Sequence, residues 1–341
     1  MLLNLSKLHK SLNILIRLTI VALSVGFIYW KVFAKGDVYQ LLDALKSYDQ
    51  NPAFIPGLLL VCLLMLINWS VESLKWQQLV NKIEQISFLK AVQSVLSGVT
   101  VSIFTPNRTG EFIGRAFILK NAQPGWAVLL TIIGSLSQLL VTILIGTVAL
   151  AFTYQSYIPS GVIIPEWAHI GMISGILMLN ISLILFFFNV PFFGLSLKML
   201  FRKPESRIAS YFKVISTLSR KELIQVFLLS TLRYAVFSLQ FYLIFKLFGI
   251  ELPVRAALYI IPLIYLALAV IPTFALSELG VRGSVSLFLI GGYFLSSTGT
   301  SLSESMSLGI VLAAALLWII NLAIPAIIGI PFVFKLRFFS K

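Results

Sequence analysis

Long apolar runs alternate with short polar connections along most of the chain. Six of the runs are long enough to cross the ~30 Å hydrocarbon core of a bilayer at about 1.5 Å per helical residue. These runs lie at residues 12–33, 53–71, 126–152, 167–189, 223–248 and 305–334. Together with two interrupted apolar regions, they predict an all-α polytopic membrane protein with about eight hydrophobic segments.

The two interrupted regions, 91–120 and 254–297, contain Pro, Gly and charged residues. Their runs 91–104 and 284–297 have 14 residues each, fewer than the ~20 that a crossing needs. The short runs favour six full spans plus two re-entrant helical hairpins. Residues 254–271 are long enough to cross the membrane. An interrupted region returns the chain to the side it came from whether it forms two full crossings or one hairpin, so the loop charges do not distinguish the two. Eight full spans therefore remain open.

Basic residues gather in alternate connections. Lys and Arg are frequent in residues 7–17, 75–90, 198–221 and 335–341. The positive-inside rule places these connections and both termini in the cytoplasm. The first interrupted region then departs from and returns to the cytoplasmic side, and the second departs from and returns to the outer side. The two regions are predicted to be inverted.

The composition agrees with a protein surrounded by lipid. Apolar residues make up 59% of the 341 residues, and charged residues only 11%. We expect one membrane domain over 1–341, with a first half at about 1–195, a cytoplasmic basic loop at 196–222 and a second half at about 223–341. The net charge of +14 lies in short loops, so topology explains it and a nucleic-acid partner is not expected. The expected location is the cell membrane.

Both interrupted regions carry the same chemical pattern. Each has a Pro followed by a Glu and, four residues after the Glu, an Arg: Glu111 with Arg115, and Glu278 with Arg282. On a helix this spacing places carboxylate and guanidinium on one face as an ion pair, which lowers the cost of carrying them into lipid. A structural staple between packed helices is the alternative reading.

A broken helix also favours anion binding. Pro ends the first half-helix, and the next half-helix offers free N–H groups and a positive dipole end. Arginine adds a fork suited to phosphate. Two inverted tips of this kind resemble transporters that bind substrate at the bilayer midplane. The candidate substrate-binding residues are Thr105, Pro106, Arg108, Gly110, Glu111, Arg115, Arg233, Pro272, Ser277, Glu278, Gly280 and Arg282.

Arg233 lies some ten residues into an apolar run. It is expected either to neutralise Glu111 or Glu278 or to bind substrate. Other polar residues in the runs have simpler readings. Asn68 and Glu72 are expected at the membrane interface beside the anchors Lys75 and Trp76, while Gln138 and Asn180 are expected to bond neighbouring helices.

No metal or cofactor site is expected. Cys62 is the only cysteine, and the two histidines, His9 and His169, have no neighbours in the sequence that suggest metal ligands. The sequence has no Walker A motif, so ATP is not expected to drive the protein directly.

The tip motifs resemble a known family. The T-P-x-R-x-G-E pattern at 105–111 and L-G-V-R at 279–282 are similar to the lysylphosphatidylglycerol synthase transmembrane region. The resemblance implies a flippase-like protein for an anionic or aminoacylated phospholipid, or for a polyprenyl-phosphate-linked lipid. Many members have Glu directly after the G-V-R, where this chain has Gly283, and Glu278 is expected to take its place. Aminoacyl transfer is not expected, because the sequence contains no segment expected to form an aminoacyl-transferase domain.

Three functions remain open at this point. The first is lipid transport, with membrane lipids of anionic headgroup as partners and Glu111 or Glu278 as a proton relay. The second is a membrane-embedded transferase for polyprenyl-phosphate sugars, whose acidic cluster would have to come from Asp37, Asp43 and Asp49. The third is a scaffold. A second copy of the chain, or a separate lipid-modifying enzyme, is the expected protein partner.

Overall fold

The computed structural model describes residues 2–29, 52–105, 108–158, 164–200, 207–271 and 275–337. These residues form helices joined by turns, and they contain no strand. The all-α prediction is therefore confirmed. The helices are α1 (Leu2–Tyr29), α3 (Phe54–Val80), α4 (Phe88–Ser102), α5 (Gly110–Ala116), α6 (Pro124–Thr153), η3 (Tyr154–Tyr157), α7 (Glu166–Phe188), α8 (Val190–Leu200), α9 (Arg207–Ser216), α10 (Arg220–Leu247), α11 (Val254–Val270), α12 (Ala275–Thr298), α13 (Glu304–Trp318), η4 (Ile319–Ala323) and α14 (Ile324–Val333).

Six stretches of helix in the described residues are long and apolar enough to cross a membrane. They are Phe54–Val80, Pro124–Thr153, Glu166–Phe188, Arg220–Leu247, Glu278–Thr298 and Glu304–Val333. This confirms a multi-pass membrane protein. Five of them match predicted spans, and Glu278–Thr298 is the addition. The first predicted span, 12–33, extends beyond the described part of α1, whose apolar portion is Ser11–Gly26.

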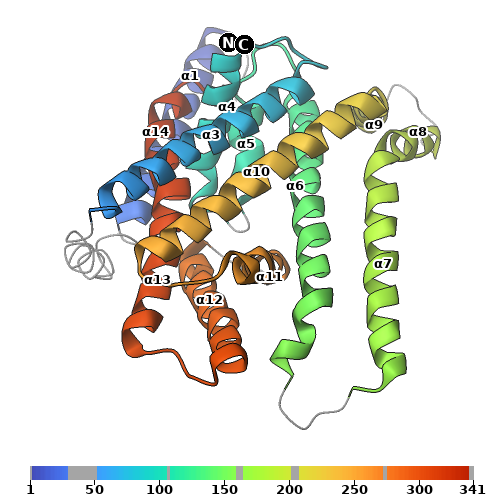
Figure 1. Ribbon diagram of the computed structural model, residues 1–341. Helices are drawn as coiled ribbons and strands as arrows, with labels where there is room; N and C mark the ends of the chain where they lie inside the picture. Colours follow the sequence, from blue (N-terminus) through green and yellow to red (C-terminus); the bar gives the residue numbers. More distant parts are fainter. Residues whose placement is uncertain are drawn as a thin grey trace.

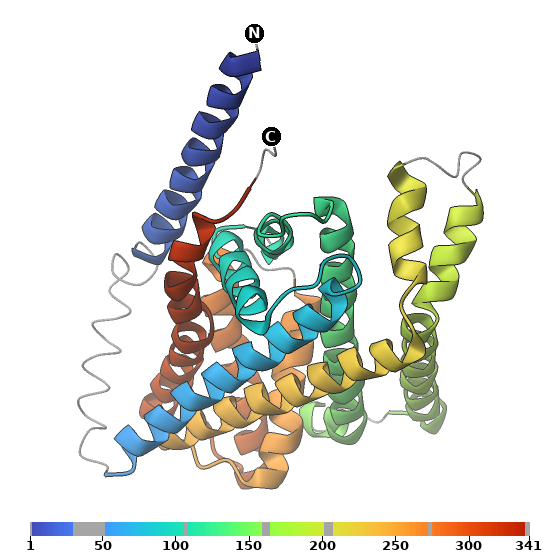
Figure 2. The same cartoon turned by 90° about the horizontal axis from the view of Figure 1, so that it is seen from above.

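Helices α3 and α10 run side by side in opposite directions across the bundle (Figures 1 and 2). Contacts follow the pair from end to end. The rings of Phe54 and Phe248 meet edge to face at 6.4 Å, and the Gln240 side chain donates to the Val61 carbonyl at 2.9 Å. At the other end, Lys82 and Glu222 form an ion pair at 2.7 Å. The polar residues in the middle of both helices are thereby brought opposite each other.

The first interrupted region folds into a hairpin of α4 and α5. A side chain at Gly114 would collide with the backbone of Gly98, so the close contact of the two helices requires glycine at position 114, and a Cβ at Gly98 would also be tightly placed. The hydroxyl of Ser97 closes the contact by donating to the Gly114 carbonyl at 3.0 Å. The hairpin starts and ends at the end of the bundle where both described termini lie (Figure 1).

The second interrupted region consists of α11 and α12, and α12 leads to the opposite end of the bundle (Figure 1). Here the sequence-based length was wrong. The helix begins at Ala275, has 24 residues, and includes Glu278 and Arg282. These two residues pair at 3.1 Å, so their charges do not end the helix. In the first region, by contrast, α4 and α5 have only 15 and 7 residues, which agrees with the prediction of short segments.

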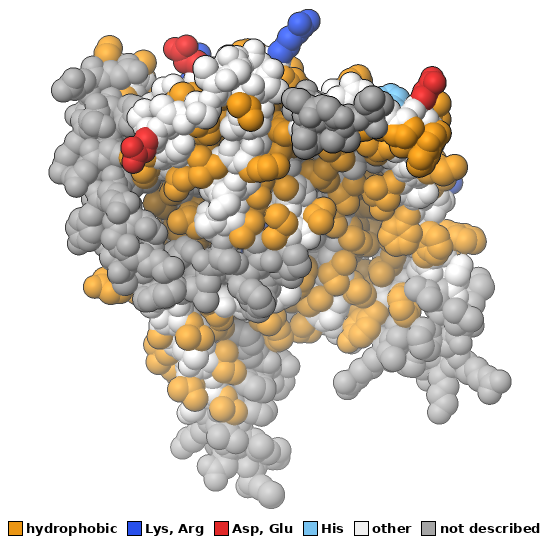
Figure 3. Space-filling model, turned by 90° about the horizontal axis from the view of Figure 1, so that it is seen from below, with side chains coloured by type: hydrophobic (Ala, Val, Ile, Leu, Met, Phe, Trp, Pro, Cys, Tyr) orange, Lys and Arg blue, Asp and Glu red, His pale blue; other side chains and the backbone are white. Residues whose placement is uncertain are grey.

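The outer surface of the bundle is rich in exposed apolar side chains. On α7, for example, Trp167, Leu177 and Met178 are all exposed. Figure 3 shows apolar side chains spread over the face seen from below. Contiguous apolar surface of this kind belongs against lipid.

The helix from α13 to α14 forms the buried centre and contains a π-helical turn at η4. Pro325 follows this turn, and because proline has no N–H, the regular helical ladder is interrupted nearby. Asn321 of η4 points its amide at the neighbouring α3, where the Asn68 side chain donates to it at 3.4 Å.

Candidate functional site

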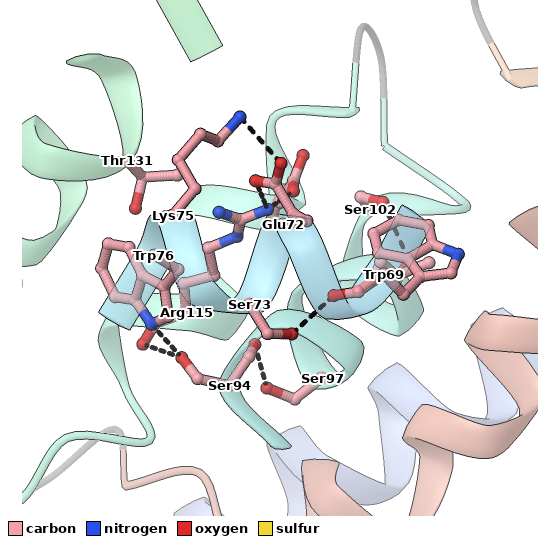
Figure 4. A network of polar contacts seen from close by, with 12 residues as sticks. Trp69, Glu72, Ser73, Lys75, Trp76, Ser94, Ser97, Ser102, Arg115 and Thr131 are labelled. Atoms are coloured by element: carbon pink, nitrogen blue, oxygen red, sulfur yellow. Dashed lines mark hydrogen bonds and ion pairs between the residues drawn. The ribbon is translucent and has the colours of Figure 1, made fainter. Parts of the chain in front are cut away.

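A buried charge cluster, here called the Glu72 network, joins α3, α5 and α10, and Figure 4 shows its residues Glu72, Lys75 and Arg115. One oxygen of Glu72 binds Arg115 at 2.8 Å, and the other binds Lys75 at 2.8 Å and Arg233 at 3.0 Å. Arg115 also pairs with Glu111, its i,i+4 neighbour. Glu72 and Arg115 are each only 3% exposed. Two carboxylates thus face three cations, which leaves the network with an excess of one positive charge.

Aromatic and hydroxyl side chains complete this environment. The Arg115 guanidinium lies 5.7 Å from the centre of the Trp76 ring, and the Trp76 indole donates to the Ser94 hydroxyl at 3.0 Å. Arg233 stacks over Trp69 at 5.1 Å. Such cation–π contacts stabilise desolvated cations.

The expectation that Asn68 and Glu72 lie at the membrane interface was wrong. Asn68, Glu72, Lys75 and Trp76 are all buried in the protein. The apolar run ends just before Glu72, which predicts the end of a span there, but α3 continues to Val80. The interior tolerates these charges because Glu72 pairs with Arg115 of α5 and with Arg233 of α10, while Lys75 pairs with Glu72 on its own helix.

Arg233 has a different ion-pair partner from the two expected, Glu72 in place of Glu111 or Glu278, and the other alternative, substrate binding, stays a prediction. Its Nη1 lies 3.0 Å from a Glu72 oxygen, and its Nε donates to the Asn68 side chain at 2.9 Å. The partner could not be predicted, because it lies 161 residues earlier in the sequence.

A second cluster, the tip cluster, joins the two interrupted regions. Glu278 at the start of α12 binds Arg108 at 2.6 Å and Arg282 at 3.1 Å. Arg108 belongs to the turn between α4 and α5. The two motifs therefore meet inside the bundle, and one carboxylate serves two arginines. At Gly283, an added Cβ would meet only the Val311 side chain. That Glu278 takes the place of an acid at this position stays a prediction.

Arg108 has a φ of 57°, a left-handed conformation that is uncommon for a residue with a side chain. Its N–H donates to the Thr105 carbonyl at 3.3 Å. Backbone strain of this kind persists where the surrounding structure fixes the residue, and it is concentrated at functional sites. The turn holds the arginine toward Glu278.

Both clusters border a central cavity of about 650 Å³. Three arginines and one carboxylate line it, so its wall carries excess positive charge. Val270 and Leu139, which are 72% and 41% exposed, belong to the same lining. The lining residues are Trp69, Arg108, Gln138, Leu139, Thr142, Arg233, Tyr234, Phe237, Tyr265, Leu268, Ala269, Val270, Ile271, Glu278, Arg282, Leu317, Trp318, Asn321 and Leu322.

The structure distributes the predicted site residues among different places. Arg108, Arg233, Glu278 and Arg282 line the cavity. Glu111 and Arg115 belong to the Glu72 network and do not line it.

Other predicted residues shape the first tip or lie away from the cavity. The Gly110 N–H donates to the Thr105 hydroxyl at 2.8 Å, and that hydroxyl donates to the Ser102 carbonyl at 3.0 Å. Gly280 is exposed and is not part of the lining. Pro106, Pro272 and the side chain of Ser277 lie outside the described residues.

Sequence reasoning missed Glu72, Lys75, Trp69 and Asn321. A signal for the first two was present, since Glu72 and Lys75 are three residues apart on one helix and can neutralise each other within a span. For Trp69 and Asn321 the sequence holds no comparable signal. The two predicted helix-bonding residues do bond neighbouring helices: Gln138 donates to the Ser230 carbonyl at 3.3 Å, and Thr147 donates to Asn180 at 3.1 Å.

The described residues contain no group of three or more His, Cys, Asp and Glu side chains that could hold a metal ion. The acidic residues Asp37, Asp43 and Asp49 lie outside these residues.

The fold and the cavity define a class: a polytopic membrane protein whose helices enclose a cationic, partly apolar cavity. Within that class the chain belongs to the lysylphosphatidylglycerol synthase TM region family, because residues 14–324 match the model of that family. The resemblance seen in the tip motifs is thereby confirmed. A search of the curated proteins and a search of the solved structures each found no match.

Proposed function

We propose that the protein transports a lipid between the leaflets of the cell membrane, with the headgroup passing through the central cavity. The lipid is an anionic or aminoacylated phospholipid, or a polyprenyl-phosphate-linked lipid, and each of these carries a phosphate. The observation that carries the proposal is the cavity wall itself, which holds three arginines, Arg108, Arg233 and Arg282, but one carboxylate, Glu278. Arg108 and Arg282 share Glu278, and Arg233 pairs with Glu72, which does not line the cavity. Excess guanidinium in a low-dielectric site binds phosphate.

The surroundings of the cavity support a lipid in preference to a small soluble anion. Val270, Ile271 and Leu139 belong to the lining and are exposed to the surface of the bundle. Acyl chains can therefore stay in the bilayer beside these side chains while the headgroup enters among the arginines. Membership of a family defined by a lipid-synthase membrane region is consistent with this assignment.

The tip cluster supplies a means of opening and closing the cavity. Glu278 holds Arg108 at 2.6 Å, and a phosphate competes with this carboxylate for the same guanidinium. Binding would separate the α4–α5 tip from α12 and favour a second conformation, since a ligand shifts an equilibrium toward the state that it binds better. We propose that the first interrupted region, with its short α4 and α5, is re-entrant, and that the second, whose α12 is long enough to cross, enters from the opposite side, as in transporters built from inverted repeats.

The orientation is part of the proposal. The connections rich in Lys and Arg lie at the end of the bundle that carries both described termini (Figure 1), so we place this end in the cytoplasm. A second copy of the chain, or a separate enzyme that makes or modifies the lipid, is the proposed partner.

Translocation in proteoliposomes tests the function. Headgroup-labelled phosphatidylglycerol and phosphatidylcholine are reconstituted with wild type, Arg108→Ala or Arg282→Ala. Loss of one charge-assisted contact of about 1.5–3 kcal/mol should slow the anionic lipid roughly 10- to 100-fold. Arg255→Ala is the matched control, because Arg255 is an exposed arginine of α11 outside the cavity. Unchanged movement in both cavity variants would contradict the proposal.

A further inference from the structure

A second cavity, the terminal basic pocket, lies apart from the central cavity and shares no lining residue with it. Its volume is about 600 Å³. Helix α1, the start of α4, the connection after α5 and the end of α14 meet around it at the end of the bundle that carries the termini (Figure 2). The pocket is lined by Arg17, Ser87, Leu89, Lys90, Gln93, Ile118, Lys120, Phe334, Lys335 and Arg337.

The pocket is strongly cationic. Five of its lining residues are Lys or Arg, and none is Asp or Glu. Lys90 is neutralised by the nearby Glu84 at 2.6 Å. For the other four cations, the described residues provide no ion-pair partner within 4.0 Å.

Internal contacts hold two of these cations, Lys335 and Arg17, and the partners in the described residues are uncharged. Lys335 donates to the Gln93 side chain at 3.0 Å, and Arg17 donates to the Leu336 carbonyl at 2.8 Å. The backbone N–H of Arg337 donates to the Phe117 carbonyl at 2.8 Å, which fixes the chain after α14 against α5. Arg17 and Arg337 act on each other as like charges, and a bound anion would relieve this repulsion.

The start of α4 adds a further positive element. Ser87 caps this 15-residue helix and lines the pocket together with Leu89 and Lys90. The N-terminus of a helix presents free N–H groups and the positive end of the helix dipole. Together with four cations that have no ion-pair partner among the described residues, it favours the binding of a phosphate group.

The pocket also has an apolar part. Leu89 is 66% exposed and Phe334 is 46% exposed, and both line the same pocket. On α1, Leu15 and Leu18 are exposed as well. A soluble phosphate would leave these side chains uncovered, whereas the acyl chains of a lipid would cover them.

We infer that the terminal basic pocket binds the headgroup of an anionic phospholipid as a resident lipid, separate from the lipid that is transported. Basic pockets between membrane helices at the cytoplasmic surface are suited to such headgroups. The lipid would join α1 to α4 and α14. Because α4 leads to the tip that carries Arg108, the resident lipid would also stabilise the base of the hairpin whose tip borders the central cavity.

Thermal unfolding of the purified full chain in a neutral detergent tests the inference. The melting temperature is measured with added phosphatidylglycerol, with phosphatidylcholine and with soluble glycerol 3-phosphate. We expect phosphatidylglycerol alone to raise it. The double variant Lys120→Gln/Arg337→Gln should weaken the apparent affinity about thirty-fold, because each basic residue near an anionic lipid contributes roughly a factor of five.

Lys213→Gln/Lys221→Gln is the matched control. It removes the same charge from exposed sites outside the pocket and should leave the effect of phosphatidylglycerol unchanged. Arg282→Ala, a variant of the central cavity, should still show the rise in melting temperature that phosphatidylglycerol causes through the terminal basic pocket. This prediction therefore holds even if the proposed transport is wrong.

Two results would overturn the inference. One is an equal response to phosphatidylglycerol in wild type and in the pocket variant. The other is an equal rise with glycerol 3-phosphate, which would show a site for a soluble phosphate. If the double variant does not fold, the single variant Lys120→Gln is used. Native mass spectrometry then counts the phosphatidylglycerol molecules that stay bound, and we expect fewer than in wild type. An unchanged number would count against the pocket.

Discussion

Glu72 is the residue on which most of the buried charge depends. It lies within 3.0 Å of Lys75, Arg115 and Arg233, and these cations come from α3, α5 and α10. Removing one partner from a buried ionic network leaves the other charges desolvated and unpaired, which commonly costs about 3–5 kcal/mol. The network therefore stabilises the protein as a unit.

Glu72→Gln should lower the melting temperature in detergent strongly, by an amount that corresponds to about 3 kcal/mol or more. Glutamine preserves the shape but cannot neutralise three cations. Thermal unfolding measures the effect, and Glu251→Gln serves as the control, since Glu251 is exposed outside the helices. A Glu72→Gln protein as stable as this control would show that the network contributes little.

Glu84 links the turn after α3 to the connection before α6. Its carboxylate accepts hydrogen bonds from the backbone N–H groups of Asn121 at 2.8 Å and Ala122 at 3.1 Å, and it pairs with Lys90. Burial raises the pKa of Glu84, but the hydrogen bonds from Lys90 and from these backbone groups outweigh it, so the pKa is lowered overall.

A lowered pKa in the folded state means that Glu84 stabilises the protein above the pKa of an unfolded glutamate, ~4.3. The contribution is lost as the pH falls through the lowered folded-state value. The melting temperatures of wild type and Glu84→Gln should therefore differ at pH 7 and converge below about pH 4. A pH series of thermal unfolding measures this, and a difference that grows on acidification would be contrary to the assignment.

At the residue scale, the sequence predicted the ion pairs within one helix but not those between helices. The i,i+4 pairs Glu111–Arg115 and Glu278–Arg282 both form, because local geometry alone sets their spacing. The contacts of Arg108 with Glu278 and of Arg233 with Glu72 depend on which helices are neighbours. Tertiary packing decides that, and the sequence does not encode it locally.

At the scale of elements, the α4–α5 hairpin depends on small residues. A side chain at Gly114 would meet the Gly98 backbone and the Ser97 carbonyl, and neither can move without unwinding α4. Gly114→Val should therefore destabilise the protein by about 1–3 kcal/mol or more, as measured by thermal unfolding.

Gly175→Val is the matched control for this variant. Gly175 lies on α7, and a Cβ there would meet nothing within 4 Å. The Gly175→Val variant should therefore unfold at nearly the same temperature as wild type. Equal destabilisation by both substitutions would mean that loss of glycine, and not the close contact of α4 with α5, is responsible.

The contact between the two tips leads to a different prediction. In Glu278→Gln, Arg108 and Arg282 lose their shared carboxylate, so a phosphate no longer competes with it. We expect tighter binding of phosphatidylglycerol, by roughly tenfold for one charge-assisted contact, together with slower translocation because release is impeded. Equilibrium binding and transport in proteoliposomes measure the two effects. Weaker binding than wild type would argue against competition between Glu278 and the headgroup.

The boundaries of α3 and α12 show why elements were harder to predict than the class of protein. In both cases the apolar run was ended at a charged residue, whereas the helix continues through Glu72 and Lys75 in α3 and starts before Glu278 in α12. An unpaired charge does end a membrane span. These charges are paired within the bundle, so the usual rule placed the boundaries several residues away from where they lie.

At the scale of the whole molecule, hydrophobic patterning was sufficient for the class. The multi-pass helical architecture and the family membership were both predictable, because span length and the tip motifs are local properties. Of the residues that line the central cavity, only the charged ones could be predicted as site residues from the sequence. Its aromatic and amide walls come from α3, α6, α10, α11 and α13 to η4, and only the assembled bundle brings them together.

The proposed orientation can be tested by labelling single cysteines in a Cys62→Ser background. Thr300→Cys lies in the exposed connection between α12 and α13, and Lys221→Cys lies at the exposed start of α10. A membrane-impermeant maleimide applied to intact cells should label the cysteine at position 300 alone, and the cysteine at position 221 should react only after the membrane is opened. The reverse pattern would invert the topology.

The central claim is that a lipid headgroup passes among the arginines of the central cavity. The most direct test is the ratio of the initial translocation rates of phosphatidylglycerol and phosphatidylcholine, measured in the same proteoliposomes for wild type and Arg282→Gln. We predict that wild type moves the anionic lipid faster and that the ratio approaches one in the variant, while Arg255→Gln keeps the wild-type ratio. A ratio that stays the same in Arg282→Gln would contradict the account.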